Sequence, residues 1–418
     1  MSINTLLPEI IKASRTLGRY ALTILSIPIV LTIRIISPFV LVRVGYLCST
    51  RIGHFSANTE LYLLETEEFK KSSGSNVIDF VYLHEPVCNR HLGKMWSRTS
   101  QINILPRAIM APICRANELI PNAKKHTAGL TRQSDRDVSG FFNKYPPILR
   151  FTQAEKKIGE ELLRDLGVPK DKRFVCLHVR DSEYLATVFP SSDTSYHDYR
   201  NSNIEDYFLA AKALASRGLY VLRMGSIIKR PLQSTDPMII DYARSGLRSD
   251  FADIYLGAHC FFCISVGSGF DAIPMIFRKP ILFVNNVPVE YFFSAQSSNL
   301  GIFKHHHDVA NTHELLFAEI FRRQAGRCLS SECFKSKDIA LRDNSPEEIM
   351  NAAVEMVERL EGTFLESEDD KFLQSEFWRV FPKDAVDDYA GMPLHGEIKA
   401  RISTTYLRSN RSLLGIRG

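Results

Sequence analysis

Apolar runs and helical patterns alternate along most of the chain. Runs rich in branched and aromatic residues, the pattern of buried strands, occupy 39–47, 77–83, 173–179, 219–223, 261–265 and 280–284. Helical periodicity marks the segments 57–69, 204–214 and 346–360. An alternation of strands and helices is typical of α/β proteins with parallel sheets. The pattern therefore predicts an α/β fold.

Two of the predicted helices carry a signal for their first turn. Ser202 precedes Glu205 by three positions, and Ser345 precedes Glu348 in the same way. In such a capping box the serine hydroxyl and the glutamate each bond a backbone N–H of the first turn. We therefore expect the helices to begin just after these serines.

Residues 20–44 form the most apolar stretch of the chain. The continuous run 20–33 is short for a bilayer span, Pro28 and Pro38 interrupt the stretch, and Lys12, Arg15 and Arg19 precede it. This pattern favours a short interfacial helix that contacts anionic lipid, with peripheral membrane contact through residues 10–45. The alternative is a core helix packed under the first lobe.

The chain has 418 residues, more than a single hydrophobic core usually fills. A Pro-Pro pair at 146–147 marks a boundary between two α/β series. We expect a membrane-associating segment, a Rossmann-like acceptor lobe, a Rossmann-like donor lobe and a helical segment that packs back on the lobes, at 1–35, 36–148, 149–335 and 336–418.

The net charge is only +5, and no basic run is interleaved with aromatic residues. This balance fits anionic ligands or a membrane surface and argues against a nucleic-acid partner. Among the eight cysteines, Cys260 and Cys263 fall in a predicted strand, where their side chains would face opposite sides. Cys328 and Cys333 lie in a polar loop, and a metal or disulfide pair there is the less favoured reading. The pattern favours a reduced, cytoplasmic chain.

Three segments with charged, small or hydroxyl residues follow predicted strands. The first runs from His178 to Ser182 and contains Arg180 and Asp181. The second runs from Arg223 to Gly225, and the third from Ser265 to Gly269. In open α/β sheets ligands bind at the carboxyl ends of strands. The guanidinium of Arg180 suits a diphosphate, although a pair with Asp181 is the alternative. These segments therefore predict a phosphate site.

The third segment consists of Ser265, Val266, Gly267, Ser268 and Gly269 and precedes a short predicted helix. Backbone N–H groups at a helix start bind anions, and the two hydroxyls add donors. The string also satisfies the dinucleotide fingerprint GxGxxA, but it lies deep in the chain and lacks a suitably placed acid. We therefore expect a phosphate cradle here and no NAD or other cofactor.

The segment Phe174 to Ser182 resembles the H-V-R segment of fucosyltransferase-like GT-B glycosyltransferases, in which the arginine binds the donor diphosphate. The span 174–225 is more closely similar to a bacterial glycosyltransferase family associated with surface-polysaccharide synthesis. The shared blocks are H-V-R-D-S-x-Y, Tyr199-Arg200-Asn201, Arg223-Met-Gly225, the turn Arg51 to His54 and the Ser/Gly loop. Asp181 stands where fucosyltransferases carry a second basic residue, which argues against GDP-fucose.

The resemblance implies a GT-B fold, a nucleotide-sugar donor held by the second lobe, and transfer without a metal. It implies a glycan or lipid-linked acceptor, with the enzyme in the cytoplasm at the inner face of the membrane. His54, His84 and Glu85 follow the first two strands and are candidates for the base; we choose His54 and Glu85. The cleft would be lined by Tyr196, Tyr199, Arg200 and Asn201.

Other functions are less well supported. A DxD metal site would fit Asp135 and Asp137, but solvated charge in a loop is the preferred interpretation. The run His305-His306-His307-Asp308 is interpreted as a surface loop, because consecutive residues rarely converge on one metal ion. The alternatives to a glycosyltransferase are a non-catalytic membrane scaffold of polysaccharide assembly and a dinucleotide-dependent Rossmann enzyme.

Overall fold

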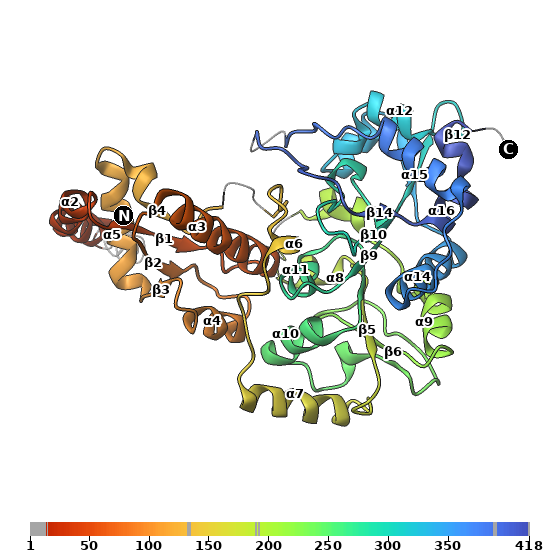
Figure 1. Cartoon of the computed structure of the whole chain (residues 1–418), viewed down its shortest axis with the longest axis horizontal. Coiled ribbons are helices and arrows are strands. Elements are labelled where there is room, and N and C mark those ends of the chain that lie inside the picture. Colours follow the sequence, from red (N-terminus) through yellow and green to blue (C-terminus); the bar gives the residue numbers. More distant parts are fainter. Residues whose placement is uncertain are drawn as a thin grey trace, which may run out of the picture. The chain divides into compact units, whose positions relative to one another are not determined.

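A computed structural model describes residues 14, 16–131, 135–188, 190, 193–387 and 391–416. Lys12 and Arg15, at the start of the expected membrane segment, lie outside these residues. The chain divides into two compact units, residues 1–135 and 136–418. Both units are built on parallel sheets with helices (Figure 1), so the predicted α/β class is confirmed.

Unit 1, residues 1–135, contains a four-stranded parallel sheet in the order β3-β2-β1-β4. Its strands are β1 (Leu41–Leu47), β2 (Val77–Leu83), β3 (Asn103–Ile104) and β4 (Thr127–Ala128). Its helices are α2 (Ile27–Ile36), η1 (His54–Asn58), α3 (Thr59–Ser73), α4 (Arg90–Ser97), α5 (Arg107–Leu119) and η2 (Ala123–His126). The predicted strand 77–83 is confirmed. Its one charged residue, Asp79, is buried and pairs with Arg43 of β1.

One core cluster of unit 1 lies between its sheet and the helices α2 and α5. Val30 and Ile33 of α2 pack with Val42 and Val44 of β1 and with Ile113 of α5. Within the sheet, a Cβ at Gly45 would stand 2.0 Å from the carbonyl oxygen of Ala128, so only glycine lets β1 and β4 approach.

Unit 2, residues 136–418, contains a seven-stranded sheet in the order β14-β10-β9-β8-β5-β6-β7, and every recorded pair is parallel. Its strands are β5 (Phe174–His178), β6 (Tyr220–Arg223), β7 (Ile239–Ile240), β8 (Cys263–Ser265), β9 (Ile281–Asn286), β10 (Leu300–Phe303) and β14 (Arg401–Ile402). Figure 1 shows α7, α10 and α11 on one face of this sheet, and α9 and α14 on the other.

The helices of unit 2 connect these strands and close the unit. They are α6 (Phe141–Lys144), α7 (Gln153–Asp165), α8 (Glu183–Val188), η3 (Ser195–Arg200), η4 (Ile204–Tyr207), α9 (Phe208–Ala215), η5 (Tyr242–Arg244), α10 (Asp250–His259), η6 (Gly269–Asp271), α11 (Ala272–Ile276), η7 (Val289–Tyr291), α12 (Phe317–Arg322), η8 (Ala325–Arg327), α13 (Ser331–Lys335), α14 (Pro346–Glu361), α15 (Glu368–Val380), α16 (Thr404–Ser409) and η9 (Arg411–Leu414).

The capping boxes gave different outcomes. Helix α14 begins after Ser345, with both bonds of the predicted box to Glu348 present. Ser202 does not cap a helix; the side chain of Asn203 accepts from the N–H of Glu205 instead, and a 3-10 turn precedes α9. The hydroxyl of Ser202 accepts a hydrogen bond from the Asn285 amide, 3.2 Å away. A tertiary partner therefore replaced the local cap.

Three further expectations were wrong. Cys260 is the C-cap of α10 and does not lie in a strand; only Cys263 begins β8. Cys328 and Cys333 form a disulfide, so the chain is not fully reduced. The run His305–Asp308 is strand β11, which pairs with β12 (His313–Glu314) and β13 (Ile339–Arg342) in an antiparallel sheet and is largely buried. The polar sequence of this run is typical of a loop, but its pairing with β12 and β13 makes it a strand and buries it.

Burial in β11 is possible because its charged groups are paired. His305 is 4% exposed and contacts two carboxylates, Glu314 through Nδ1 and Glu348 through Nε2, the latter at 3.0 Å. Burial by itself would lower the pKa of His305, but the two carboxylates outweigh it and raise the pKa to about 9. The imidazolium is thus a structural cation.

Candidate functional site

The three segments predicted to bind phosphate lie at one edge of the seven-stranded sheet. They follow the neighbouring strands β6, β5 and β8, which are parallel, so their carboxyl ends meet. His178 pairs in register with Ser265, and Leu177 with Arg223. The topology therefore brings the three segments together at the edge where open α/β sheets bind ligands.

Arg180 leaves β5 and turns toward the segment that contains η3. Its Nη1 donates to the carbonyl of His197 at 2.9 Å, and its own carbonyl accepts from the N–H of Ser202 at 3.0 Å. Burial, followed by the charge of Arg200, lowers the pKa of Arg180 to about 10. Among the described residues no carboxylate oxygen lies within 4 Å of the guanidinium nitrogens of Arg180 or of Arg200. The alternative ion pair between Arg180 and Asp181 therefore does not form. Two neighbouring cations without an ion pair favour an anionic ligand.

Arg223, the last residue of β6, is the most deeply buried cation of this edge. It is 1% exposed, its Nε has no hydrogen-bond partner, and its Nη1 lies 3.5 Å from Asp241. Burial lowers its pKa, and Asp241 offsets this only in part. A guanidinium with an unsatisfied buried nitrogen retains the capacity to bind one more acceptor.

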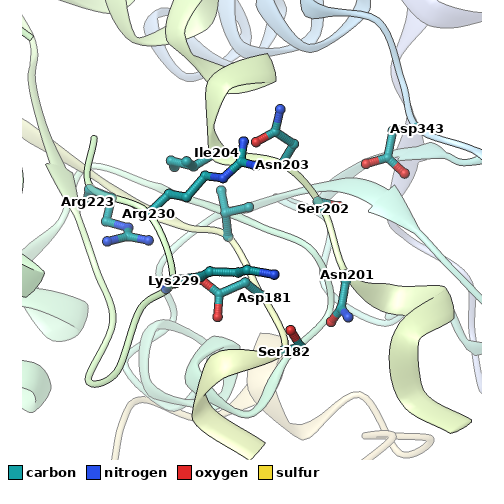
Figure 2. A pocket seen from close by; sticks show the side chains of 11 residues that line it. Asp181, Ser182, Asn201, Ser202, Asn203, Ile204, Arg223, Lys229, Arg230 and Asp343 are labelled. Carbon is teal, nitrogen blue, oxygen red and sulfur yellow. Dashed lines mark hydrogen bonds between the residues drawn. The ribbon is translucent and has the colours of Figure 1, made fainter. Parts of the chain in front are cut away.

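A cavity of about 460 Å³ opens beside this arginine (Figure 2). Its lining includes both carboxylates and cations, from β6, from the segments that follow β5 and β6, and from the residue after β13, notably Asp181, Asn201, Asn203, Arg223, Lys229 and Asp343. Asp181 accepts from the N–H groups of Glu183 at 3.0 Å and Lys229 at 2.9 Å. Asp181 therefore holds the two loops together at the cavity wall.

The Ser/Gly loop after β8 is organised by Asp271, a residue that the sequence analysis did not select. Asp271 accepts from the hydroxyl of Ser265 and, at 2.6 Å, from the N–H of Ser268. Burial raises the pKa of Asp271 to about 7, against the lowering effect of the Ser265 hydroxyl. The Ser265 hydroxyl, expected to face phosphate, is thus engaged inside the loop. Gly267 has φ +74°, which a side chain would disfavour.

His178 links β5 to this loop. Its Nδ1 lies 3.0 Å from the Ser268 hydroxyl, and its ring stacks on Phe270 with centroids 5.2 Å apart. Burial, with contributions from Arg223 and Arg180, lowers the pKa of His178 to about 4. A neutral imidazole therefore fixes the position of Ser268. The contact between His178 and Ser268 connects the carboxyl end of β5 to the loop that follows β8.

Lys304 was missed by sequence reasoning. It follows β10 at the same sheet edge, its side chain is 5% exposed, and its Nζ lies 2.7 Å from both Asp343 and the carbonyl of Asn201. Burial lowers its pKa, Asp343 raises it in part, and the charge of Arg180 lowers it further. The one available signal was its position directly after the apolar run 300–303.

The predicted cleft residues separate into two groups. Asn201 lines the cavity, and Arg200 lies near Arg180 with a buried Nε that has no partner. Tyr199, in contrast, is 8% exposed and packs against Phe334 of α13, so it belongs to the core. Tyr196 is 42% exposed and is not among the residues that line the cavity.

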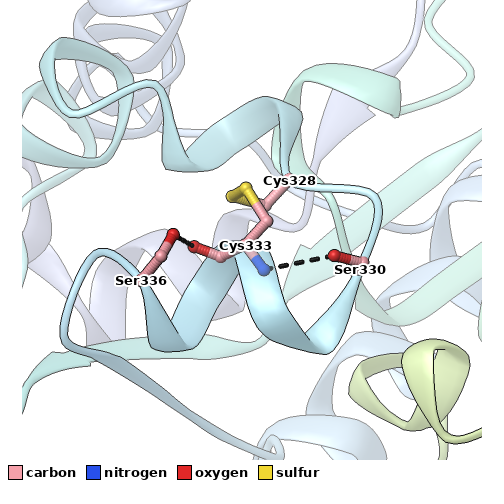
Figure 3. The surroundings of a disulfide bond; sticks show 4 residues. All are labelled: Cys328, Ser330, Cys333 and Ser336. Atoms are coloured by element: carbon pink, nitrogen blue, oxygen red, sulfur yellow. Dashed lines mark hydrogen bonds between the residues drawn. A yellow bond between two sulfur atoms is a disulfide. The ribbon is translucent and has the colours of Figure 1, made fainter.

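The disulfide supports this part of the site. It joins Cys328 to Cys333, the latter inside α13 (Figure 3). The hydroxyl of Ser331 in α13 donates to the carbonyls of Ser195 and Tyr196 in η3 at 3.1 and 3.3 Å. The cross-link therefore lies behind the short helix that carries Arg200.

In unit 1 the proposed base candidates follow β1 and β2. His54 is half-buried and begins η1, a π-helical turn of a kind that often occurs at functional sites. Glu85 is exposed and forms a solvated pair with Arg107 at 3.4 Å. His84 stacks on Tyr46 with centroids 4.2 Å apart, and burial lowers its pKa. No hydrogen bond joins His54 to Glu85 in the part of the chain that the structure describes.

Within the described ranges no group of three or more His, Cys, Asp or Glu side chains is placed to hold a metal ion. Asp137, half of the DxD pattern, is 2% exposed and accepts from the N–H groups of Phe141 and Phe142 at 2.6 and 3.0 Å. It is a buried helix cap, and the expectation of solvated loop charge was wrong for this residue.

No family model and no curated protein sequence matches the chain. Among solved structures it is similar to a glycosyl transferase family 9 protein from Veillonella parvula (10% identity, TM-score 0.44, 77% of this chain, 98% of that chain) and to the E. coli ADP-heptose LPS heptosyltransferase II (12%, 0.32, 62%, 90%). It is also similar to the E. coli heptosyltransferase TibC, with 12% identity and a TM-score of 0.29. That match covers 58% of this chain and 57% of the length of TibC. These proteins are bacterial glycosyltransferases, the class that the sequence resemblance indicates.

Proposed function

We propose that the chain is a GT-B type glycosyltransferase that moves a sugar from a nucleotide-sugar donor to a glycan or lipid-linked acceptor in bacterial surface-polysaccharide synthesis. One observation carries the proposal. Arg180, Arg200 and Arg223 gather at one sheet edge with fewer carboxylate partners than their burial requires. A donor diphosphate supplies the missing negative charge and hydrogen-bond acceptors.

The same cations account for catalysis without a metal. When the sugar–phosphate bond breaks, negative charge grows on the departing diphosphate. Guanidinium groups fixed in a poorly solvated site stabilise that charge more than mobile water does, because they need not reorganise. We assign the diphosphate to Arg180 and Arg223, with the Ser265–Gly269 loop beside it, and the polar groups Asn201 and Asn203 to the rest of the donor.

The acceptor is assigned to unit 1. His54 is proposed to remove the proton of the acceptor hydroxyl, with Glu85 as the second candidate, because imidazole changes charge near neutral pH. We place the enzyme in the cytoplasm, peripherally at the inner face of the membrane, where lipid-linked acceptors are present. The competing functions are a non-catalytic scaffold and a dinucleotide-dependent enzyme.

The first experiment is a thermal-shift screen of the purified chain against ADP, GDP, UDP, CDP, dTDP, CMP and NAD, without added metal. A ligand that binds only the folded state raises the melting temperature. We expect one nucleoside diphosphate to stabilise the chain selectively. The Arg180→Ala variant should lose this shift.

Arg217→Ala is the matched control. Arg217 is exposed, and its Nη1 donates to the carbonyl of Ala213 in α9, so its removal leaves the sheet edge unchanged. This control should keep the wild-type shift. A shift with NAD alone would favour the dinucleotide enzyme, and no shift with any nucleotide would favour the scaffold. Equal shifts in Arg180→Ala and wild type would remove the diphosphate from Arg180.

A further inference from the structure

The N-terminal helical segment Thr16–Ile36 has its apolar side chains on the outside. It is 21 residues long, and its most apolar 18-residue window has mean hydropathy 1.7 and is only 22% buried. Nine of its large apolar side chains are more than one-third exposed, with Leu17, Leu25 and Ile35 all above 70%. A water-soluble helix buries such residues and exposes polar ones. One stripe of the segment packs in the core of unit 1, but most of its apolar side chains lie outside that contact.

Three polar residues of the segment, Thr23, Ser26 and Arg34, face unit 1. Thr23 and Ser26 are 6% and 7% exposed and continue as one helical stripe into Val30 and Ile33. Arg115 of α5 donates to the Thr23 hydroxyl at 3.0 Å. Arg34 also turns inward, donating to Asn117 at 2.6 Å and to the carbonyl of Pro121 at 3.2 Å.

The hydroxyls of the segment are satisfied within the helix. Thr23, Ser26 and Thr32 each donate to the carbonyl four residues before, at 2.8, 2.8 and 2.9 Å. Even the exposed Thr32 therefore presents its methyl group and not a free donor. Backbone and side-chain donors satisfied internally are what a hydrocarbon environment requires.

The orientation relative to a bilayer follows from the packing. The segment is about 31 Å long at 1.5 Å per residue, enough to cross the hydrocarbon core. However, its buried stripe from Thr23 to Ile33 lies against unit 1, whose helix α5 contains Arg107, Arg115 and Glu118. A charged helix does not enter hydrocarbon at modest cost. While docked on α5, the segment is therefore confined to the membrane surface.

Charge identifies the kind of membrane. The sequence from 10 to 59 contains no Asp or Glu. Of its six cations, Arg34 is turned inward and Arg43 pairs with Asp79 at 2.6 Å, which leaves Lys12, Arg15, Arg19 and Arg51 for a membrane surface. Basic residues beside an apolar helix face bind anionic headgroups, at about 1 kcal/mol for each cation near the surface. A protein interface would have a rim of mixed polar residues around its apolar centre, whereas the charged residues of this stretch are all basic.

We propose that the outer face of Thr16–Ile36 is a monotopic docking surface that inserts its leucine and isoleucine side chains into one leaflet of an anionic bilayer. The inference deepens, and rests on, the membrane location proposed above. It depends on the geometry of unit 1 and not on nucleotide binding. A failure here therefore leaves the thermal-shift outcome unaffected, and the reverse also holds.

The test is flotation of the full chain with vesicles of phosphatidylcholine, alone or with about one-third phosphatidylglycerol. Wild type should float with the anionic vesicles and only weakly with the neutral ones. The double variant Leu25→Asp/Ile35→Asp should bind at least about tenfold less, because two carboxylates would enter the apolar leaflet. Both side chains are exposed, so the folded unit should keep its far-UV circular dichroism and melting temperature.

Leu365→Asp is the matched control, since Leu365 is 88% exposed in unit 2 and should float like wild type. The proposal is overturned if wild type does not float with anionic vesicles, or if the double variant floats equally well. It is also overturned if light scattering shows a wild-type dimer that the double variant abolishes, because the face would then cover a second copy of the chain.

Discussion

Two buried charged regions of unit 2 are built on opposite principles. Around β11, His305 lies between Glu314 and Glu348, and Asp308 pairs with Arg323 at 2.7 Å. At the carboxyl edge of the large sheet, Arg180 and Arg200 have no carboxylate within ion-pair distance among the described residues, and Arg223 has an unpaired Nε. Both regions are shielded from water, yet only the first is electrically satisfied.

The difference distinguishes structure from function. A buried charge with complete partners contributes to folding, and removing one partner leaves the others unpaired. A buried charge with incomplete partners costs folding energy, and the chain recovers it when a ligand of opposite charge binds. The comparison therefore predicts that substitutions in the two regions affect different measurements.

The largest effect is expected for Arg223→Met, which keeps the volume of the side chain and removes its charge. We expect kcat/KM for sugar transfer to fall by about 10³-fold, because the developing diphosphate charge loses a fixed partner. The free energy of unfolding in urea should stay level or rise, since an incompletely paired cation is removed. Arg173→Met, at the opposite end of β5 and paired with Glu361 at 2.5 Å, is the control and should leave transfer unchanged. A stability loss in Arg223→Met with transfer unchanged would contradict the comparison.

The paired region should respond to pH. The pKa of His305 is about 9 when folded against about 6.5 when unfolded, so its stabilising effect is complete below pH 6.5 and is lost as pH rises through 9. A shift of this size corresponds to about 3 kcal/mol. Urea unfolding should therefore show His305→Gln to be less stable than wild type at about pH 6, with a smaller difference at about pH 9.5. Nucleotide shifts should survive in the variant, and an equal deficit at both pH values would show that His305 does not act as a cation.

The disulfide behind η3 is expected to have a smaller effect. Closing a six-residue loop, Cys328 to Cys333, restricts the unfolded chain by about 2 kcal/mol. The variant Cys328→Ser/Cys333→Ser should unfold correspondingly earlier in urea. Wild type in a dithiol reductant should match this variant, and Cys48→Ser, a substitution of a free cysteine, serves as the control. Identical unfolding curves for reduced and oxidised wild type would rule out this contribution.

The smallest effect is expected for Arg230→Ala, at the rim of the same cavity. The side chain is 59% exposed and forms a solvated pair with Glu205 at 3.4 Å. Nucleotide affinity should fall by at most about tenfold, and the loss should fade at high salt because an exposed charge is screened. A loss as large as that of Arg223→Met would show that rim and buried cations are equivalent, which would remove the basis of the comparison.

Much of the fold was predictable from local pattern. Strand 77–83 and the capping box of α14 were confirmed because their signals depend on residues two to four positions apart. The ends of β5 and β6 were also predictable, since a charged residue after an apolar run marks the end of a buried strand. Small and hydroxyl residues gave the same signal after β8. Ser202 and the histidines of β11 were misjudged because distant partners, Asn285, Glu314 and Glu348, changed their environment.

The sequence by itself determined the α/β class, the candidate cations Arg180, Arg200 and Arg223, and the apolar character of the N-terminal helix. These properties depend on the periodicity and type of side chains along the chain. Only the tertiary structure decided that Lys304 lies at the charged edge and that the Ser265 hydroxyl donates to Asp271. It also decided that the N-terminal helix has its apolar side chains on the outside. Each of these depends on which distant segment supplies the partner, because burial and pairing are properties of neighbours in space and not of neighbours in sequence.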